Sequence, residues 1–236
     1  MKRAIGSVVV ALLALLVTGC NGGNTDTTYK VEIVPTDFVS TIDNEFLPLT
    51  PGTTKIYEGD TGDGLEHVEV LVTNETREIL GVPCVVVRDT VAVNGQVVED
   101  TFDWYAQDKD GNVWYFGEDV KDYKDGKVVS TAGSWEAGVD GAQPGIVMQA
   151  EPEVGEEYRQ EYYRGEAEDM ARVVGLDESV AVKAGAYQGC LKTYEWTPLD
   201  PEAKEYKYYA PGVGLVMETI AEDETKRIEL VEARKS

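Results

Sequence analysis

Residues 83–107 read PCVVVRDTVAVNGQVVEDTFDWYAQ, and this stretch decides the fold class. Asn94-Gly95 lies between two runs rich in valine, threonine and aromatic residues, and Asn-Gly in that setting is the strongest short signal for a β-hairpin. β-Branched and aromatic residues fit the pleated, half-buried surface of a sheet. The stretch therefore predicts two antiparallel strands, at 83–93 and 96–107, joined by a two-residue turn.

Strand-like runs and turn signals continue on both sides of this hairpin. The run at 66–74 alternates, so that Val68, Val70 and Val72 share one face. Strands this short and this closely spaced favour an antiparallel meander over parallel strands joined by helices. We predict a mostly β fold of curved sheets or half-barrels, with at most one short helix, near residues 167–173.

Parts of the chain repeat at similar spacing, which predicts two related halves. The sequences around three residues of the first half recur around three of the second, namely Gly52, Cys84 and Trp104 against Gly155, Cys190 and Tyr208. We expect a first β half at 36–131, a second at 151–236, and a glycine-rich connection at 132–150.

Cys84 and Cys190 are the cysteines of these two halves. Equivalent positions lie equally far from a pseudo-twofold axis, so a disulfide can form only if that distance is short. An exported compartment would permit the bridge. A disulfide and a pair of buried free thiols are both open at this point.

The N-terminus, residues 1–20, reads MKRAIGSVVVALLALLVTGC. Lys2 and Arg3 precede an apolar run that is shorter than the ~20 residues a membrane-spanning helix needs. Residues 17–20, VTGC, resemble the bacterial lipobox, in which an aliphatic residue and two small residues precede a cysteine. The resemblance implies that residues 1–19 are a signal peptide and that Cys20 carries diacylglycerol and acyl chains such as palmitate.

The same resemblance implies a location in the cell envelope. Residues 20–35 would form the lipidated N-terminus and a tether, because two or three acyl chains anchor a protein stably where one is marginal. Position 21 is Asn rather than Asp, which in Gram-negative lipoproteins indicates the outer membrane, facing the periplasm. The expected partner of this segment is the lipid bilayer.

The chain is strongly acidic, with 44 Asp and Glu against 21 Lys and Arg. Removal of residues 1–19 would take away two basic residues and no acid, leaving a net charge of −25. Such a charge repels phosphate groups, so we expect no nucleic-acid partner. It suits cationic partners or divalent ions, and it also serves solubility alone.

Residues suited to catalysis are few. His67 is the one histidine in the sequence, and it lies on the face of its strand opposite Val68. One histidine cannot supply a two-histidine metal site, and no serine lies in a nucleophile-elbow motif. We expect no enzyme, although the many carboxylates leave a carboxylate-based hydrolase as a third alternative.

Residues 108–112, DKDGN, are the best candidate for a metal site. The side-chain oxygens partly match the spacing of a calcium loop, with the candidate ligands Asp108, Asp110, Asn112 and Asp119. The glycine stands at the fourth position instead of the sixth, and the flanking runs alternate as strands, which favours a hairpin turn. We expect no cofactor, with calcium as the alternative.

Aromatic residues are the other conspicuous feature. Adjacent aromatic pairs on a strand place one ring on each face, so that one ring joins the core and the other can line a groove. The groove candidates are Trp104, Trp114, Trp135 and Tyr208.

Three strings resemble a widespread family of uncharacterised bacterial lipoproteins and periplasmic proteins. They are WYAQDKDGNVWYFGE at 104–118, GSWEAGVDGA at 133–142 and YKYYAPGVGLV at 206–216. The resemblance covers roughly residues 36–220, and the last string also resembles the closing hairpin of periplasmic half-barrels. It implies fold and location but no substrate, and we carry over no catalytic residue.

We therefore expect a membrane-anchored, non-catalytic module that binds an apolar ligand or an envelope protein in the concavity of a curved sheet. The alternative is a structural or calcium-stabilised surface protein.

Overall fold

The structure is a computed structural model that describes residues 29–62 and 64–235 of the chain. The signal peptide at 1–19, Cys20 and the first part of the predicted tether lie outside the described residues. Near the end of that tether is a short 3-10 helix, Pro35–Asp37 (η1), which begins with a proline.

Strands make up most of the remaining described chain. Their bounds are β1 (Phe38–Val39), β2 (Thr53–Asp60), β3 (Leu65–Ile79), β4 (Val82–Val93), β5 (Gln96–Asp108), β6 (Val113–Lys124), β7 (Lys127–Ser130), β8 (Trp135–Glu136), β9 (Gln143–Met148), β10 (Glu157–Arg159), β11 (Glu161–Tyr162), β12 (Met170–Val182), β13 (Gly185–Thr197), β14 (Asp200–Ala210), β15 (Gly214–Ile220) and β16 (Asp223–Lys235).

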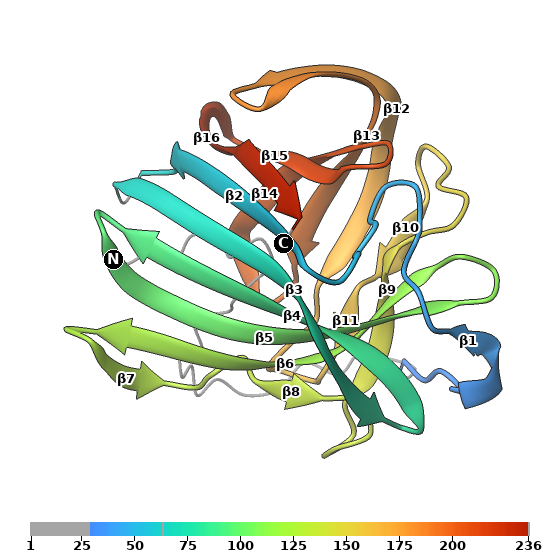
Figure 1. Cartoon of the computed structure of the whole chain (residues 1–236). Helices are drawn as coiled ribbons and strands as arrows, with labels where there is room; N and C mark the ends of the chain where they lie inside the picture. Colours follow the sequence, from blue (N-terminus) through green and yellow to red (C-terminus); the bar gives the residue numbers. More distant parts are fainter. Residues whose placement is uncertain (1–28, 63, 236) are drawn as a thin grey trace.

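The strands form one antiparallel sheet that curls into a nearly closed barrel (Figure 1). The order is β10-β12-β13-β14-β15-β16-β2-β3-β4-β5-β6-β9-β11, with β1 on β5 and with β7 and β8 on β6. The two ends of this order approach one another where Gly145 of β9 lies against the backbone of Arg159 and Gln160, so closely that a side chain at 145 would clash. The predicted antiparallel β fold is confirmed.

The one short helix that the sequence allowed, near residues 167–173, does not form, in agreement with a prediction of at most one. Ala167 pairs with Tyr163 in an isolated bridge, and Met170 begins β12 opposite Trp196 of β13. Along β12, Ala171 and Val173 are fully buried while Arg172 between them is partly exposed. This alternation has the period of a strand, which outweighs the helix propensity of the short alanine-containing run.

The hydrogen-bond register of the first half recurs in the second. The Gly52 amide donates to the Val72 carbonyl at 2.8 Å, and the Gly155 amide donates to the Val173 carbonyl at the same distance. Because Val72 lies opposite Val87, and Val173 lies opposite Thr193, the strands β2–β6 correspond to β10 and β12–β15.

A β-bulge marks the same point in each half. The register shifts between Trp104 and Tyr105 in the β5–β6 ladder, and between Tyr208 and Tyr209 in the β14–β15 ladder. The correspondence assigns residues of the first half to residues of the second, including Asp89 to Glu195, Asp103 to Lys207, Tyr105 to Tyr209, and Glu118 to Glu218. The connection at 132–150 carries β8 and β9.

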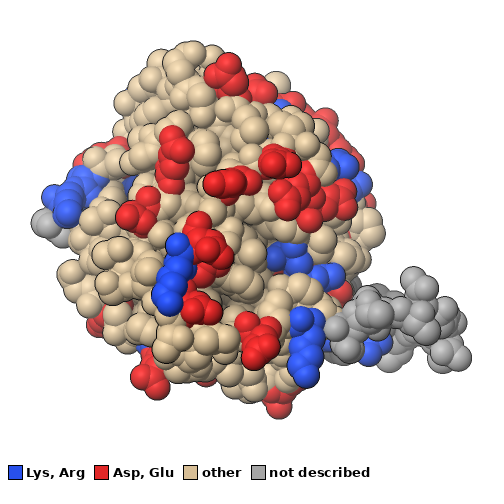
Figure 2. All heavy atoms as spheres, turned by 90° about the vertical axis from the view of Figure 1, so that its right-hand side faces the viewer, with Lys and Arg blue, Asp and Glu red and all other residues tan. Residues whose placement is uncertain are grey.

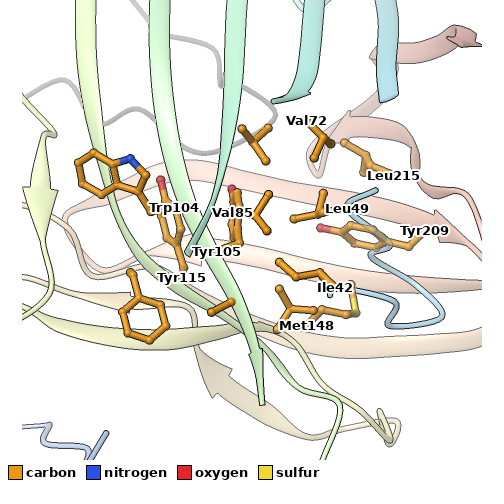
Figure 3. Close-up of a cluster of buried hydrophobic side chains, with 14 of the residues drawn as sticks. Ile42, Leu49, Val72, Val85, Trp104, Tyr105, Tyr115, Met148, Tyr209 and Leu215 are labelled. Atoms are coloured by element: carbon orange, nitrogen blue, oxygen red, sulfur yellow. The ribbon is translucent and has the colours of Figure 1, made fainter. Parts of the chain in front are cut away.

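The core lies inside the barrel, where it lines the interior. Tyr105 and Tyr115 stack with their ring centroids 4.9 Å apart. Figure 3 shows these two rings on one side of the core and Tyr209 on the other, with Leu49 between them. Burial of such large side chains is the main stabilisation of a sheet curved on itself.

The segment at 40–50 crosses one end of the barrel and is fastened there by Asn44. The Asn44 amide donates to the carbonyls of Gly111 and Gln149 at 2.9 and 3.0 Å. Its side-chain oxygen accepts from the Phe46 and Leu47 amides at 2.9 and 3.1 Å. The nitrogen of this buried side chain therefore joins the segment to the barrel, while its oxygen holds the turn of the segment itself.

On the face shown in Figure 2, acidic residues are numerous but do not gather in one patch. On the face that Figure 2 displays, Asp and Glu cover more area than Lys and Arg, and both kinds are dispersed. Within the described ranges, no helix is long and apolar enough to cross a membrane.

Candidate functional site

The barrel encloses a cavity with an apolar wall and several charged groups. The cavity is partly open to solvent, and the centre of a water-sized sphere can occupy about 90 Å³ of it. The apolar wall includes Leu47 and Leu49 of the crossing segment and Val72, Val87 and Leu215 of the strands. Five carboxylates and two ammonium groups also line it, those of Asp89, Asp103, Glu161, Asp169, Glu195, Lys55 and Lys207.

In the second half, Lys207 is the centre of a buried ion cluster. Its Nζ lies 3.1 Å from Glu195, 3.7 Å from Glu205 and 3.8 Å from Glu218. Although burial opposes its charge, these carboxylates raise the pKa of Lys207 well above its usual value. Lys207 therefore carries a positive charge that these acids share.

Glu195 is also well supplied with hydrogen bonds. Its Oε1 accepts from the Thr193 hydroxyl at 2.7 Å and from the Tyr209 hydroxyl at 3.2 Å. Its Oε2 faces Lys207. Both oxygens of this buried carboxylate thus have partners.

In the first half the corresponding positions hold acids without such a cation. Asp89 is 1% exposed, and neither of its carboxylate oxygens has a hydrogen-bond partner among the described residues. Asp103 is fully buried, and its Oδ1 accepts from the Tyr115 hydroxyl at 2.7 Å while its Oδ2 has no such partner. Asp103 stands where the register of the second half places Lys207, so no ammonium group pairs with Asp89.

The burial of these acids disfavours their charged forms. Burial, together with the neighbouring charge of Asp103, raises the pKa of Asp89 well above its usual value, although the charge of Lys207 acts in the opposite direction. Burial also raises the pKa of Asp103 to about 7, although the Tyr115 hydrogen bond acts in the opposite direction. At neutral pH this pair therefore needs protons or a nearby cation.

A second pair of acids lies where the two ends of the sheet meet. Glu161 accepts from the Trp135 indole N–H at 2.9 Å, and burial raises its pKa well above the usual value. Burial raises the pKa of Asp169 to about 7, and its Oδ1 has no hydrogen-bond partner in the described chain. The acidic lining of the cavity thus extends to the place where the two ends of the sheet meet.

Lys55 of β2 also lines the cavity. Burial lowers the pKa of its ammonium to about 8, and no hydrogen bond or ion pair joins it to another described residue. An ammonium in this state can bind an anionic group or lose its proton at mildly alkaline pH.

The predicted groove residues do not line this cavity. Trp104 and Tyr208 are one position away from Tyr105 and Tyr209, which do. Because successive strand residues point to opposite faces, Trp104 instead packs under the Arg77 guanidinium, 4.2 Å from its ring centroid. The Tyr208 hydroxyl donates to Glu224 at 2.9 Å.

The other two tryptophans make structural contacts. The Trp114 indole N–H donates to Asp108 at 2.8 Å. Trp135 borders the cavity indirectly, because it contacts Glu161 and meets the Tyr115 ring edge-on at 5.4 Å.

Two residues of the calcium candidate, Asp108 and Asn112, bind one another in the β5–β6 turn. Asp108 accepts from the backbone amide and the side-chain amide of Asn112, both at 2.9 Å. Asp119 pairs with Lys121 at 2.8 Å. Asp110 lies between Asp108 and Asn112 in the sequence. Over residues 29–62 and 64–235, no three His, Cys, Asp or Glu side chains gather as a metal site.

Cys84 and Cys190 are buried and free. The Cys84 thiol donates to the Val82 carbonyl at 3.6 Å, and burial raises its pKa to about 12. Of the two alternatives left open by the sequence, the structure has free thiols. His67 lies on the exposed side of β3, with its Nδ1 3.5 Å from Glu58.

Sequence reasoning missed the charged residues of the cavity, although a signal was present. Asp89 lies two residues from the buried Val87 and Val91, and Asp103 lies two residues from the buried Tyr105. Residues two apart on a strand share one face, so both aspartates belong to a buried face. A charge on the apolar face of an alternating strand is the pattern expected for a group facing an interior site.

Comparison with known proteins gives little further information. No protein-family model matches the chain, and no curated protein matches it. A solved structure described as "a putative lipoprotein from Parabacteroides distasonis ATCC 8503" shares 15% identity, with a TM-score of 0.43, over 81% of this chain and 99% of that one.

Proposed function

We propose that this chain is an exported lipoprotein, anchored through Cys20, whose barrel binds a small ligand in its interior cavity. The anchoring follows from the VTGC sequence at 17–20 and from the polar tether behind it. If the host is Gram-negative, Asn21 favours the outer membrane, with the barrel facing the periplasm. The bilayer is then the partner of the N-terminus, and the ligand is the partner of the barrel.

One observation carries the binding proposal, namely the unpaired carboxylate of Asp89 inside a lined cavity. A buried polar group without a partner costs free energy, and buried ions without partners are rare in folded proteins. Asp89 shares the lining of this cavity with apolar side chains such as Val72, Val87 and Leu215. Such a combination of apolar surface and a few polar groups is typical of small-molecule sites.

Native mass spectrometry of the full chain, purified in detergent, tests the binding proposal. We expect a discrete added mass that is lost in Val87→Phe, because Val87 lines the cavity and is 2% exposed. The matched control is Val128→Phe, because Val128 is 48% exposed on β7 and its substitution leaves the cavity unchanged. Absence of any added mass, or equal loss in both variants, contradicts interior binding.

Metabolic labelling with a fatty acid tests the anchoring proposal separately. We expect label in the wild-type chain and in Cys84→Ala, since Cys84 is buried in the barrel. Cys20→Ala should carry no label and should keep residues 1–19. Label that persists in Cys20→Ala contradicts the assignment of Cys20.

A further inference from the structure

We propose that the ligand of the cavity is a small organic amine whose ammonium group pairs with Asp89 and Asp103 and whose apolar part packs on the leucine and valine wall. This inference rests on the proposed function, because it names the chemical class of the same ligand. It follows from comparing the two halves of the barrel at equivalent register positions.

The second half shows what the first half lacks. Lys207 lies opposite Thr193, and Glu195 lies two residues further along β13, which makes Glu195 and Lys207 a diagonal pair. Their charged atoms are 3.1 Å apart. Asp103 lies opposite Val87, and Asp89 lies two residues further along β4, which is the same diagonal relationship.

The diagonal pair of the first half, Asp89 and Asp103, therefore consists of two acids. Glu118 lies directly opposite Asp103 in the next ladder, as Glu218 lies opposite Lys207. It too is buried, and its Oε2 has no hydrogen-bond partner within the described part of the chain. In the first half, two carboxylates that line the cavity, those of Asp89 and Asp103, thus stand at the register positions that an acid and an ammonium group occupy in the second half.

Aromatic rings and the apolar wall favour an organic cation for this place. Tyr57, Tyr105 and Tyr115 line the cavity beside Asp89 and Asp103, and tyrosine faces attract ammonium groups. Val72, Val87 and Leu49 continue the lining and match an aliphatic or aromatic body. A metal ion suits the place less, because the described residues hold no group of three metal ligands.

Isothermal titration of the full chain with three matched probes tests the inference. The probes are n-butylamine, 1-butanol and butyrate, which share an alkyl body and differ in the polar group. We expect n-butylamine to bind at least about tenfold more tightly than 1-butanol, since a hydrogen-bonded charge in a buried site is worth that much. Butyrate should not bind at Asp89.

Two variants locate the ammonium group. Asp89→Asn should weaken n-butylamine binding by about tenfold or more, whereas the exposed Glu75→Gln should leave it unchanged. Asp103→Lys gives the first half the lysine of the second half, and this internal ammonium should abolish amine binding. Circular dichroism of each variant establishes that the barrel is folded, and the comparison uses only folded variants.

The outcomes separate this inference from the function on which it rests. If 1-butanol binds as tightly as n-butylamine, or if Asp89→Asn and Glu75→Gln bind the amine alike, the amine assignment is wrong while interior binding stands. If no probe binds and no ligand co-purifies with the chain, both proposals are wrong. Preference for the amine that depends on Asp89 supports both.

Discussion

Asp103 of β5 and Lys207 of β14 occupy equivalent positions in the two halves of one barrel, each directly opposite a glutamate of the next strand. The ammonium group of the lysine lies 3.1 to 3.8 Å from three carboxylates of its half. The aspartate instead adds an acid to its half. This exchange of charge at one register position makes the interior asymmetric and leaves Asp89 with no cation within ion-pair or hydrogen-bond distance among the described residues.

The stability of the barrel should depend on the protonation of Asp103. Its pKa is about 7 in the folded chain, against about 3.9 in an unfolded one, so the folded state holds the proton more firmly. This contribution is full below about pH 4 and is lost as the pH rises towards 7. The charged and titratable groups that interact with Asp103 are Asp89, Glu99, Tyr105, Tyr115, Glu118 and Glu161.

Asp103→Asn removes that titration while its amide oxygen can still accept from Tyr115. We expect the melting temperature of the variant, relative to wild type, to rise steadily between pH 4 and pH 7. The exposed Asp177→Asn should show a constant difference over the same range. A constant difference for Asp103→Asn as well would mean that Asp103 is ionised in the folded chain at low pH.

Lys207→Met should destabilise the fold strongly. Removing one member of a buried ion cluster leaves unpaired buried charges and typically costs about 3–5 kcal/mol. Lys183→Met is the matched control, because Lys183 pairs with Glu58 at the surface, where an ion pair contributes about 0–1 kcal/mol. Urea denaturation gives both free energies of unfolding, and similar values for the two variants would contradict the buried cluster.

Asn44→Ala should loosen the segment that crosses the barrel end. The change leaves the carbonyls of Gly111 and Gln149 without the Asn44 donor, at a cost of about 1–3 kcal/mol. The exposed Asn74→Ala is expected to change the free energy of unfolding by less than about 0.5 kcal/mol. Hydrogen exchange at the Phe46 and Leu47 amides should accelerate in the first variant only.

The two barrel cysteines should react as free thiols only after unfolding. Thiol titration of Cys20→Ala without reductant should find two reactive thiols in denaturant and none in the native chain, because Cys84 and Cys190 are buried. Reductant should leave the melting temperature unchanged. Absence of reactive thiols in denaturant would show that a disulfide joins the two positions.

The sequence predicted the fold better than it predicted the cavity. Asn94-Gly95 and the alternating runs beside it are local signals, and the hairpin β4–β5 forms where they place it. Tyr105 and Tyr209 line the cavity in place of the predicted Trp104 and Tyr208. Adjacent residues of a strand face opposite sides of the sheet, so only one of each aromatic pair can face inward. Which residue of each pair faces inward depends on the β-bulges at these positions, and the bulges arise from pairing between strands.

The charges inside the barrel could not be derived from composition. Among 44 acidic residues, the few that matter are those that the curvature of the sheet turns inward. Whether a buried aspartate faces a lysine or another acid depends on contacts between strands that are far apart in the sequence, as with Asp89 and Lys207.

A crystal structure of the protein grown with n-butylamine tests the central claim most directly. The account predicts a bound amine in the cavity, with its nitrogen within hydrogen-bond distance of a carboxylate oxygen of Asp89 and near Asp103. A cavity that holds only water, or an amine whose nitrogen points away from both aspartates, would contradict it.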